Sequence, residues 1–454
     1  MEIKALKDII EKGESVDLEL KRSFHSSQEI AKTICSFANT QGGVLILGVE
    51  DNKKISGLCE DMDQLQKRIS DANSTVHPKP IMNIEIHEVE GKKVATLIVH
   101  RADSSVFHSF EGAIYVRIGT TTQKLEGNSI LEFLRNRQIL LFDEGSDYSA
   151  NVDSLDKNKI KEYLEVRGQE NYLKSHSIED FLLSKKFAVA LPNLKIKNIS
   201  ILFFAKDPQS FFPYTQIKLV RFDGIEPVKV ISYEEAKGSL PQTINQAINF
   251  VNRYISKEFV IKGIKRKEIA LLPEEAIRES IINSVAHRDY FNKNEIQISI
   301  FDDRVEITNP GGLPEGMEKE LLGILSVQRN PLIYQMLKDY GFMEGIGSGI
   351  AKIYSTMQSA QLQKPEFFVS KDIFRIVLRI KKIEEIELAI KHNLNDRQIR
   401  ALDYVRINKK IKTSDYARLN KISVPSALKD LKKLQKIKLI KKIGTFKGAY
   451  YIGV

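Results

Sequence analysis

Three polar side chains that could bind a ligand recur at helical spacing in the middle of the chain. Glu279, Asn283 and His287 stand four residues apart in the segment PEEAIRESIINSVAHRDY, and this spacing places them on one face of a helix. Apolar residues fall on the other face: Ile277, Ile281, Ile282 and Val285. A carboxylate, an amide and an imidazole in one line suit a nucleotide and its metal ion, although an ordinary solvated face has the same pattern.

Two glycine clusters follow this helix. The segment EIQISIFDDRVEITNPGGLPEG predicts two strands joined by a turn at Asp302 and Asp303. It ends in the first cluster, which consists of Asn309, Pro310, Gly311 and Gly312. The second cluster, Gly345, Gly347 and Gly349, precedes a helical pattern, so its backbone amides could point at phosphate groups. This cluster lacks the adjacent Gly, Lys and Ser or Thr of a Walker A loop, so P-loop helicase activity is not expected.

The order of these motifs resembles the histidine-kinase, gyrase and Hsp90 (GHKL) type of ATPase, in the HATPase_c_4 form found in bacterial AlbA_2-type transcriptional regulators. The resemblance implies that Glu279 polarises the attacking water and that Asn283 ligates Mg²⁺ beside ATP. It also implies that Gly345, Gly347 and Gly349 cradle the phosphates, under a lid over residues 313–344 in which Arg329 contacts phosphate.

One position departs from the wider superfamily. Asn309, which precedes Gly311 and Gly312 in the first cluster, stands where the superfamily has an aspartate that binds the adenine amino group. An asparagine offers a carbonyl acceptor but no charge. Adenine preference and ATP turnover therefore stay open.

The first 137 residues predict a compact α/β unit. An amphipathic helix at the start precedes the strand VDLEL, a helix with a capping box from Ser26 to Glu29 and the buried strand GGVLILGV. A helix near 61–73 and strands at 81–89, 93–100 and 113–118 complete the unit. The segments ESVDLELKRS, FANTQGGVLILGVED and AIYVRIGTTT resemble the AlbA_2 domain shared with Schlafen proteins.

That second resemblance implies a metal-dependent nuclease site as an alternative activity. In Schlafen nucleases three acidic residues form the cleavage site, and the corresponding positions here are Glu14, Glu19 and Asp51. Clustered carboxylates would bind Mg²⁺ or Mn²⁺, which can generate a hydroxide nucleophile. The structural alternative is that Glu19 pairs with Lys21 or Arg22 and that Asp51 forms a turn.

Between these regions, DEGSDYSANVDSLD reads as a linker. Beyond it we expect helices at 157–167, 177–183 and 240–256, and strands NISILFFA and TQIKLVRF around the turn KDPQSFFPY. The phenylalanines at 203, 204, 211 and 212 alternate with aliphatic residues, so core packing is favoured over base stacking.

Length, composition and charge limit the class of protein. The 454 residues suffice for about three domains, and no apolar run is long enough to span a bilayer, so a cytoplasmic location is expected. Cys35 and Cys59 are too few for a disulfide framework or a zinc site. The net charge of +10 is concentrated near the C-terminus, where residues 395–454 hold 16 Lys and Arg against 4 Asp and Glu.

The basic C-terminal segment predicts an anionic partner, with nucleic acid favoured over membrane. Its three helical patterns place Ile399, Leu402 and Val405 inward, then Leu428, Leu431 and Leu434, with Ser423 as a cap. The strands LIKKI and AYYIGV follow, and the whole resembles a winged helix-turn-helix. Its third helix would enter the major groove. The expected DNA contacts are Ser426, Lys429, Lys432, Lys433 and Lys436, with Lys447 on the wing.

We therefore expect an α/β (α+β) multidomain protein: an AlbA_2 domain at 1–137, a linker at 138–152, a GHKL-like α/β sandwich at 153–382 and a winged helix at 395–454. The leading function is a DNA-binding regulator that responds to ATP and Mg²⁺. The alternative is a nuclease acting on RNA or DNA, for instance in defence against phage. Self-association into a homo-oligomer is expected from both resemblances.

Overall fold

The computed structural model describes residues 3–103, 105–190, 193–261, 265–314, 317–325, 327–343, 349–360, 362–380, 392, 394–445 and 449–453. The chain divides into two compact units, Met1–Gly145 and Ser146–Val454, and each is treated by itself. The described helices include none with the length and apolarity that a membrane span requires. Both units mix helices with sheets, which confirms the expected α/β class.

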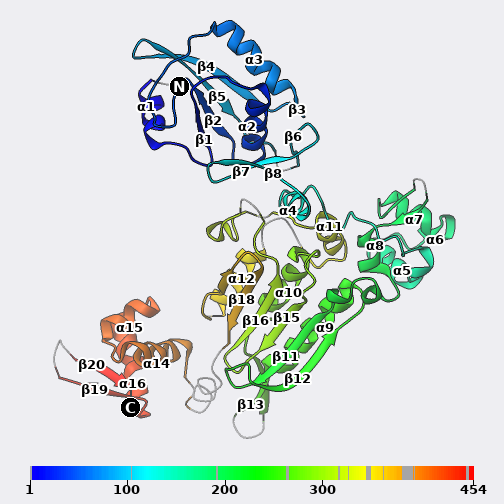
Figure 1. Ribbon diagram of the computed structural model, residues 1–454. Helices are drawn as coiled ribbons and strands as arrows, with labels where there is room; N and C mark the ends of the chain where they lie inside the picture. The colour runs from blue at the N-terminus through cyan, green and yellow to red at the C-terminus, as the bar shows by residue number, and fades with distance from the viewer. Residues whose placement is uncertain are drawn as a thin grey trace. The chain divides into compact units, whose positions relative to one another are not determined.

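The first unit is built on a four-stranded sheet of order β1-β2-β5-β4 (Figure 1). Strand β1 runs parallel to β2, and the other neighbours are antiparallel. Alternate residues of β2 serve two cores: Leu45 and Leu47 pack with α2 and α3, whereas Ile46 packs with Leu6 and Ile10 of α1. This alternation follows from the two-residue period of a strand. The elements are α1 Ile3–Lys12, β1 Leu18–Lys21, α2 Ser27–Asn39, β2 Gly43–Leu47, α3 Met62–Ser74, β3 Val76–His77, β4 Met82–Val89, β5 Lys92–Val99, β6 Ser109–Phe110, β7 Tyr115–Ile118, β8 Thr121–Lys124 and α4 Asn128–Asn136.

The second unit contains a six-stranded sheet of order β12-β11-β15-β16-β18-β17. Strands β11 and β15 are parallel, and the other neighbours are antiparallel. Helix α9 contacts β11, β12 and β15, and α10 contacts β16 as well as α9 and α12. Its elements are β11 Ile217–Asp223, β12 Lys229–Ala236, α9 Leu240–Ile255, β13 Ser256–Ile261, β14 Lys265–Ala270, α10 Glu274–His287, β15 Ile296–Ile300, β16 Arg304–Pro310, η4 Lys319–Leu321, α11 Pro331–Asp339, α12 Gly349–Ser359, β17 Glu366–Val369 and β18 Ile373–Arg379.

A small helical part precedes this sheet, and here one prediction is wrong. The segment NISILFFA, expected as a strand, forms helix α8 with all seven of its residues buried. A short uninterrupted apolar run has no period that separates a buried helix from a buried strand. The prediction that the four phenylalanines are core residues is confirmed for Phe203, Phe204 and Phe212, which are buried, whereas Phe211 is only partly buried. The elements are η1 Val152–Ser154, α5 Lys157–Val166, α6 Tyr172–Ser175, α7 Ile178–Ser184, β9 Ala188–Val189, β10 Lys195–Ile196, α8 Asn198–Phe204, η2 Pro208–Ser210 and η3 Pro213–Thr215.

The C-terminal residues form three helices and a hairpin around one core. Ala401, Tyr416, Ala427, Leu431 and Leu434 belong to this core. Leu428 was expected inward but is 37% exposed, because the smaller Ala427 completes the buried stripe instead. Ser423 occupies the N-cap position without a side-chain bond to the helix backbone. The elements are α14 Asp396–Asn408, α15 Thr413–Asn420, α16 Val424–Lys436, β19 Ile440–Ile443 and β20 Tyr450–Gly453.

Candidate functional site

Helix α10 carries the predicted polar line above a buried apolar face. Ile277, Ile281, Ile282 and Val285 are at most 1% exposed, which confirms the predicted packing. Glu279, Asn283 and His287 are only partly buried. The Nδ2 of Asn283 donates to the Oε1 of Glu279 over 3.4 Å, so the amide and the carboxylate act as one polar group.

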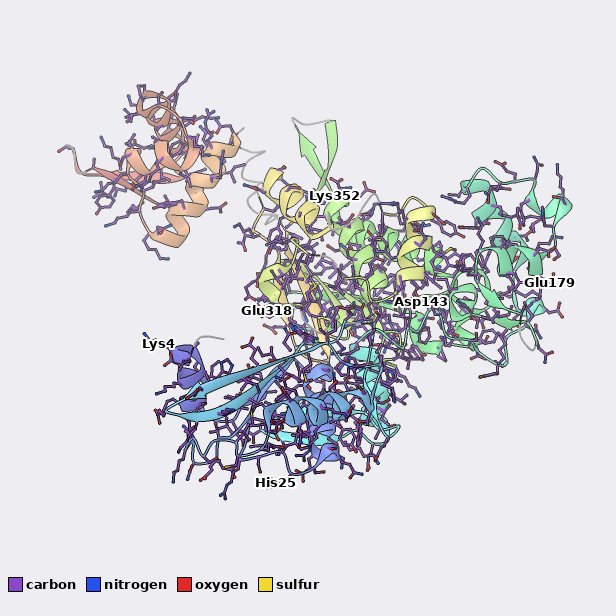
Figure 2. The ribbon with its side chains drawn as sticks, turned by 90° about the horizontal axis from the view of Figure 1, so that it is seen from above. Lys4, His25, Asp143, Glu179, Glu318 and Lys352 are labelled. Carbon is purple, nitrogen blue, oxygen red and sulfur yellow. The ribbon has the colours of Figure 1, made fainter. Side chains whose placement is uncertain are left out.

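Helix α12 begins next to the side chains of Glu279 and Asn283. A Cβ added to Gly349, its first residue, would lie 2.6 Å from both the Nδ2 of Asn283 and the Oε1 of Glu279, so a larger residue would displace these two side-chain ends. The two helices are also joined by Lys352, labelled in Figure 2, whose Nζ lies 3.0 Å from a carboxylate oxygen of Glu275. The start of α12 is therefore held against the polar face of α10. Gly345 and Gly347 lie outside the described residues.

Asn309 supplies an unpaired polar atom beside these helices. It lies in β16, paired with Phe374 of β18, and is 4% exposed. Its Oδ1 is buried and has no hydrogen-bond partner in the described part of the chain. Because an unsatisfied buried carbonyl costs about 1–3 kcal/mol, this oxygen favours any ligand that brings a donor to it.

A cavity of about 120 Å³ opens beside Asn309. Its polar lining comes mainly from one helix and one strand: Ser280, Asn283, Ser284, His287 and Asn309. Most of the remaining lining is apolar and includes Ile307, Met317, Leu322, Leu325, Met343, Phe367 and Ile376. A cavity of roughly 150 Å³ admits a benzene ring, so this one has room for about one ring.

At the two glycines after Asn309, neighbouring atoms lie so close to the backbone that a side chain would clash with them. A Cβ on Gly311, which has φ +92°, would lie 2.6 Å from the Cβ of Asp289 and 2.7 Å from the Nη1 of Arg329. A Cβ on Gly312 would overlap the carbonyl oxygen of Ser370. Both glycines line the cavity, and their expected contact with a nucleotide stays a prediction.

Arg329 has backbone partners in this structure. Its Nη1 donates to the carbonyl of His287 at 3.1 Å, and its Nη2 donates to the carbonyl of Gly312 at 2.8 Å. Burial lowers the pKa of this guanidinium, and the nearby Asp289 opposes that shift. Arg329 thus ties the end of α10 to the end of β16, and its expected contact with phosphate stays a prediction.

The three acidic residues of the first unit have separate environments. Glu19 is 8% exposed and pairs with Arg117 and, at 2.9 Å, with Lys21. The Oε1 of Glu14 accepts the backbone N–H of Leu20 at 3.1 Å, and Asp51 lies exposed in a turn. Within the described ranges, no group of three or more His, Cys, Asp or Glu side chains could hold a metal ion. Glu19 therefore has the structural partners that the sequence offered as its alternative role, with Arg117 added.

The predicted DNA-facing residues of α16 and the wing divide into three groups. Ser426, Lys429, Lys432 and Lys436 are exposed. Lys433 is partly buried, with its Nζ 3.4 Å from the Oε1 of Gln398. Lys447 lies outside the described residues. Asp430 holds the buried side of α16 in place. It is 6% exposed and accepts from Arg397 at 2.9 Å and from the hydroxyl of Tyr416 at 3.0 Å.

Comparison with known families assigns two of these regions. Residues 14–126 match the family "Schlafen, AlbA_2", and residues 293–378 match "Putative ATP-dependent DNA helicase recG C-terminal", the HATPase_c_4 family. The chain carries an AlbA_2 domain and a HATPase_c_4 domain. Both predicted resemblances are confirmed for these ranges. The second match begins after α10, so Glu279 and Asn283 precede it.

Two solved structures are similar to this chain. The DIP2311 protein from Corynebacterium diphtheriae shares 17% identity, with a TM-score of 0.43 over 99% of this chain and 96% of that one. The N-terminal domain of a "Putative ATP-dependent DNA Helicase RecG-related Protein" from Nitrosomonas europaea shares 26% identity, with a TM-score of 0.21 over 27% of this chain and 92% of that one. A search of curated proteins found no match.

His287 adds a neutral imidazole to the cavity of the HATPase_c_4 region. Burial, followed by the charge of Arg329, lowers its pKa to about 4, against a smaller opposing effect of a backbone hydrogen bond to Val327. The ring is therefore uncharged at neutral pH. It can donate or accept one hydrogen bond but adds no positive charge to the site.

Two residues at this site were not found from the sequence. Tyr334 of α11 lines the cavity, and burial followed by the charge of Glu279 raises the pKa of its hydroxyl. Asn330 donates to the carbonyls of Ala286 and Arg288 and so holds the start of α11 to the end of α10. Asn330 before Pro331 is a recognisable helix start, but nothing in its spacing points to α10.

Proposed function

We propose that this chain is a nucleotide-responsive, DNA-binding regulator that takes up ATP with Mg²⁺ in its HATPase_c_4 region. The name of the second matched family, "Putative ATP-dependent DNA helicase recG C-terminal", associates the chain with ATP and with DNA. The observation that supports the nucleotide part is the unpaired oxygen of Asn309 at the edge of a largely apolar cavity. A flat base with a donor on its edge satisfies both features.

The amide of Asn309 fits the edge of adenine chemically. Its oxygen can accept from the exocyclic amino group, and its NH₂ can donate to the neighbouring ring nitrogen. A carboxylate could only accept. Asn309 is therefore a suitable partner for a purine base, and the aspartate of the wider superfamily is not needed for binding.

The Glu279 and Asn283 pair fits a magnesium ion and phosphate. Mg²⁺ prefers hard oxygen ligands and keeps several waters, and Asn283 would offer it a carbonyl oxygen. When bound, the ion offsets the charge of the phosphates. Glu279 would accept a proton from a water that it orients, and the amides at the start of α12 would face the phosphate groups.

Helix α11 links this site to the helical part of the same unit. At its start, Asn330 is bonded to the end of α10. At its end, Asp339 accepts from the hydroxyl of Tyr163 of α5 at 2.7 Å and lies 3.2 Å from Arg167, the residue that follows α5. Tyr340 stacks on Phe203 of α8 with ring centroids 5.8 Å apart. We infer that a nucleotide that moves Tyr334 would shift α5 and α8 through this helix.

The C-terminal helices supply the proposed DNA-binding surface. The order of three helices and a hairpin with an exposed lysine face on α16 supports a winged helix, with Ser426, Lys429, Lys432 and Lys436 toward DNA. We place the domain limits at 1–137, 153–382 and 395–454, with a linker at 138–152. In a cell such a regulator would act in the cytoplasm.

Calorimetry on the full chain tests the nucleotide proposal. We expect ATP with Mg²⁺ to bind, and Asn309→Leu, which removes the amide at similar volume, to weaken binding by roughly tenfold to a hundredfold. The triphosphate of purine riboside lacks the amino group but keeps the ring nitrogen, so Asn309→Leu should weaken its binding less than the binding of ATP. Asn136→Leu, on the exposed side of α4, is the control. No binding by the wild type, or equal ATP binding by Asn309→Leu, would refute the proposal.

The nuclease alternative has a direct test of its own. Because Glu19 is buried against Arg117 and Lys21, we expect no cleavage of structured RNA or single-stranded DNA by the full chain with Mg²⁺ or Mn²⁺. Gel analysis of end-labelled substrates would measure this. Metal-dependent cleavage that Glu19→Gln removes, and that Glu29→Gln on the exposed start of α2 retains, would instead establish the nuclease.

A further inference from the structure

Exposed apolar residues gather on the outer strand of the six-stranded sheet, β12, and on the turn that leads into it. Among the described residues, strand β12 has a neighbour only on its β11 side, so its other edge is an end of the sheet (Figure 1). The apolar residues form what we call the β12 patch, with exposed fractions of 55, 84, 52, 54 and 51%: Ile225, Val228, Val230, Ile231 and Tyr233. Grouped exposure of this kind marks contact surfaces in proteins.

The register of β12 shows which side chains share a face. Tyr233 pairs with Val220 and Val230 pairs with Phe222, and the pairing shifts between these two rungs, so Ile231 is an additional residue in a bulge. Residues paired across a ladder project to the same side. Tyr233 and Val230 therefore lie beside the cluster of Val220, Phe222 and Phe301.

The neighbouring residues face the opposite side of the sheet. Glu234 pairs with Leu219 in the ladder and forms an ion pair with Arg253 of α9 at 2.6 Å, which places it on the helix-covered face. Lys229 pairs with Asp223, which follows Phe222 and so faces the opposite side of the sheet. Lys229 therefore also lies on the helix-covered face. One face of the edge thus carries Val230 and Tyr233, and the other carries Lys229 and Glu234.

This arrangement is complementary to itself. We propose that the β12 patch is the surface through which two copies of this chain associate, antiparallel, about a two-fold axis between Ile231 and Ser232. That axis sets Val230 against Tyr233 and Lys229 against Glu234 of the second copy, on matching faces, and each pair occurs twice. The bulge interrupts the edge hydrogen bonds at the axis, so the side-chain pairs supply most of the contact.

Charge around the patch supports a second copy as the occupant. The rim consists of pairs of opposite sign: Lys229 with Asp223 at 2.8 Å, Lys237 with Glu235 at 2.7 Å, and Arg253 with Glu234 at 2.6 Å. A surface for nucleic acid would have an excess of positive charge. These pairs are exposed and contribute little to folding, so Lys229 and Glu234 can exchange partners across the axis.

Sedimentation of the full chain tests the proposal. We expect the wild type to form a dimer of about twice 51.7 kDa. Tyr233→Glu should weaken dimerisation by about a hundredfold, and Lys229→Glu or Glu234→Lys, which each create two like-charge pairs, by about tenfold. Val166→Lys, which charges an exposed apolar position of α5, should leave the dimer intact. Circular dichroism would establish that each variant is folded.

Mixing the two charge variants examines the register itself. In a pair formed by one Lys229→Glu chain and one Glu234→Lys chain, both contacts again join opposite charges, so the mixture should recover wild-type affinity. A monomeric wild type would overturn the proposal. So would dimers that none of the three variants weakens. The proposal would also be wrong if the two charge variants, each weakened alone, did not recover affinity when mixed. These results are independent of nucleotide and of DNA.

Discussion

Reversing three lysines of α16 should reduce the affinity of the full chain for duplex DNA by two to three orders of magnitude near 0.1 M salt. The variant is Lys429→Glu, Lys432→Glu and Lys436→Glu, and all three side chains are exposed on one helix. Each lysine that neutralises a phosphate releases counterions on binding. The slope of log affinity against log salt should therefore fall by about 3.

The control for this variant has the same change in net charge elsewhere. Lys157→Glu, Lys161→Glu and Lys174→Glu alter exposed lysines of α5 and α6 and should leave most of the affinity and the salt slope intact. Fluorescence anisotropy with a labelled duplex at several salt concentrations measures both quantities. If both triple variants lost affinity equally, DNA attraction would be a property of overall charge, and the proposed winged-helix surface would be wrong.

Gly312→Ala should destabilise the HATPase_c_4 region by roughly 3–5 kcal/mol, the range of severe core substitutions. The added Cβ would overlap the carbonyl of Ser370 and lie 2.7 Å from that of Lys371. Both atoms are backbone, and the N–H of Gly312 already donates to Lys371 at 3.0 Å, so the chain cannot shift cheaply. Calorimetric melting should show one transition lowered by about 10 °C.

Substitution of a second glycine, Gly224, serves as a control that distinguishes the effect of atomic overlap from the effect of backbone strain. Gly224 has φ +81° with nothing near its Cβ position, so Gly224→Ala should cost only about 1 kcal/mol of backbone strain. If Gly312→Ala melted no lower than Gly224→Ala, the close packing after Asn309 would be refuted. The same proteins should differ in ATP binding, because Gly312 lines the cavity and Gly224 does not line it.

The repetitive elements were predictable because their signals are local. The buried isoleucines of α10 follow a helical period, and the hairpin of β15 and β16 follows from alternation around Asp302 and Asp303. Where the apolar residues have no clear helical or strand period, the local sequence does not determine which element forms or which side chains are buried. Helix α8 has seven buried residues in a row, and the exposed Leu428 belongs to a helix in which Ala427 was the better-placed core residue.

The amino-acid sequence by itself determined the residue types that could bind a nucleotide: an acid and an amide one turn apart, followed by glycines where the backbone must approach closely. Tertiary structure decided which of these side chains are available. Glu19 is paired with Arg117, 98 positions away, and Arg329 is bonded to two backbone carbonyls, whereas the oxygen of Asn309 is left without a partner in the described part of the chain. The physical reason is that a hydrogen bond depends on distance in space, which the spacing of residues along a chain does not specify beyond a few turns of helix.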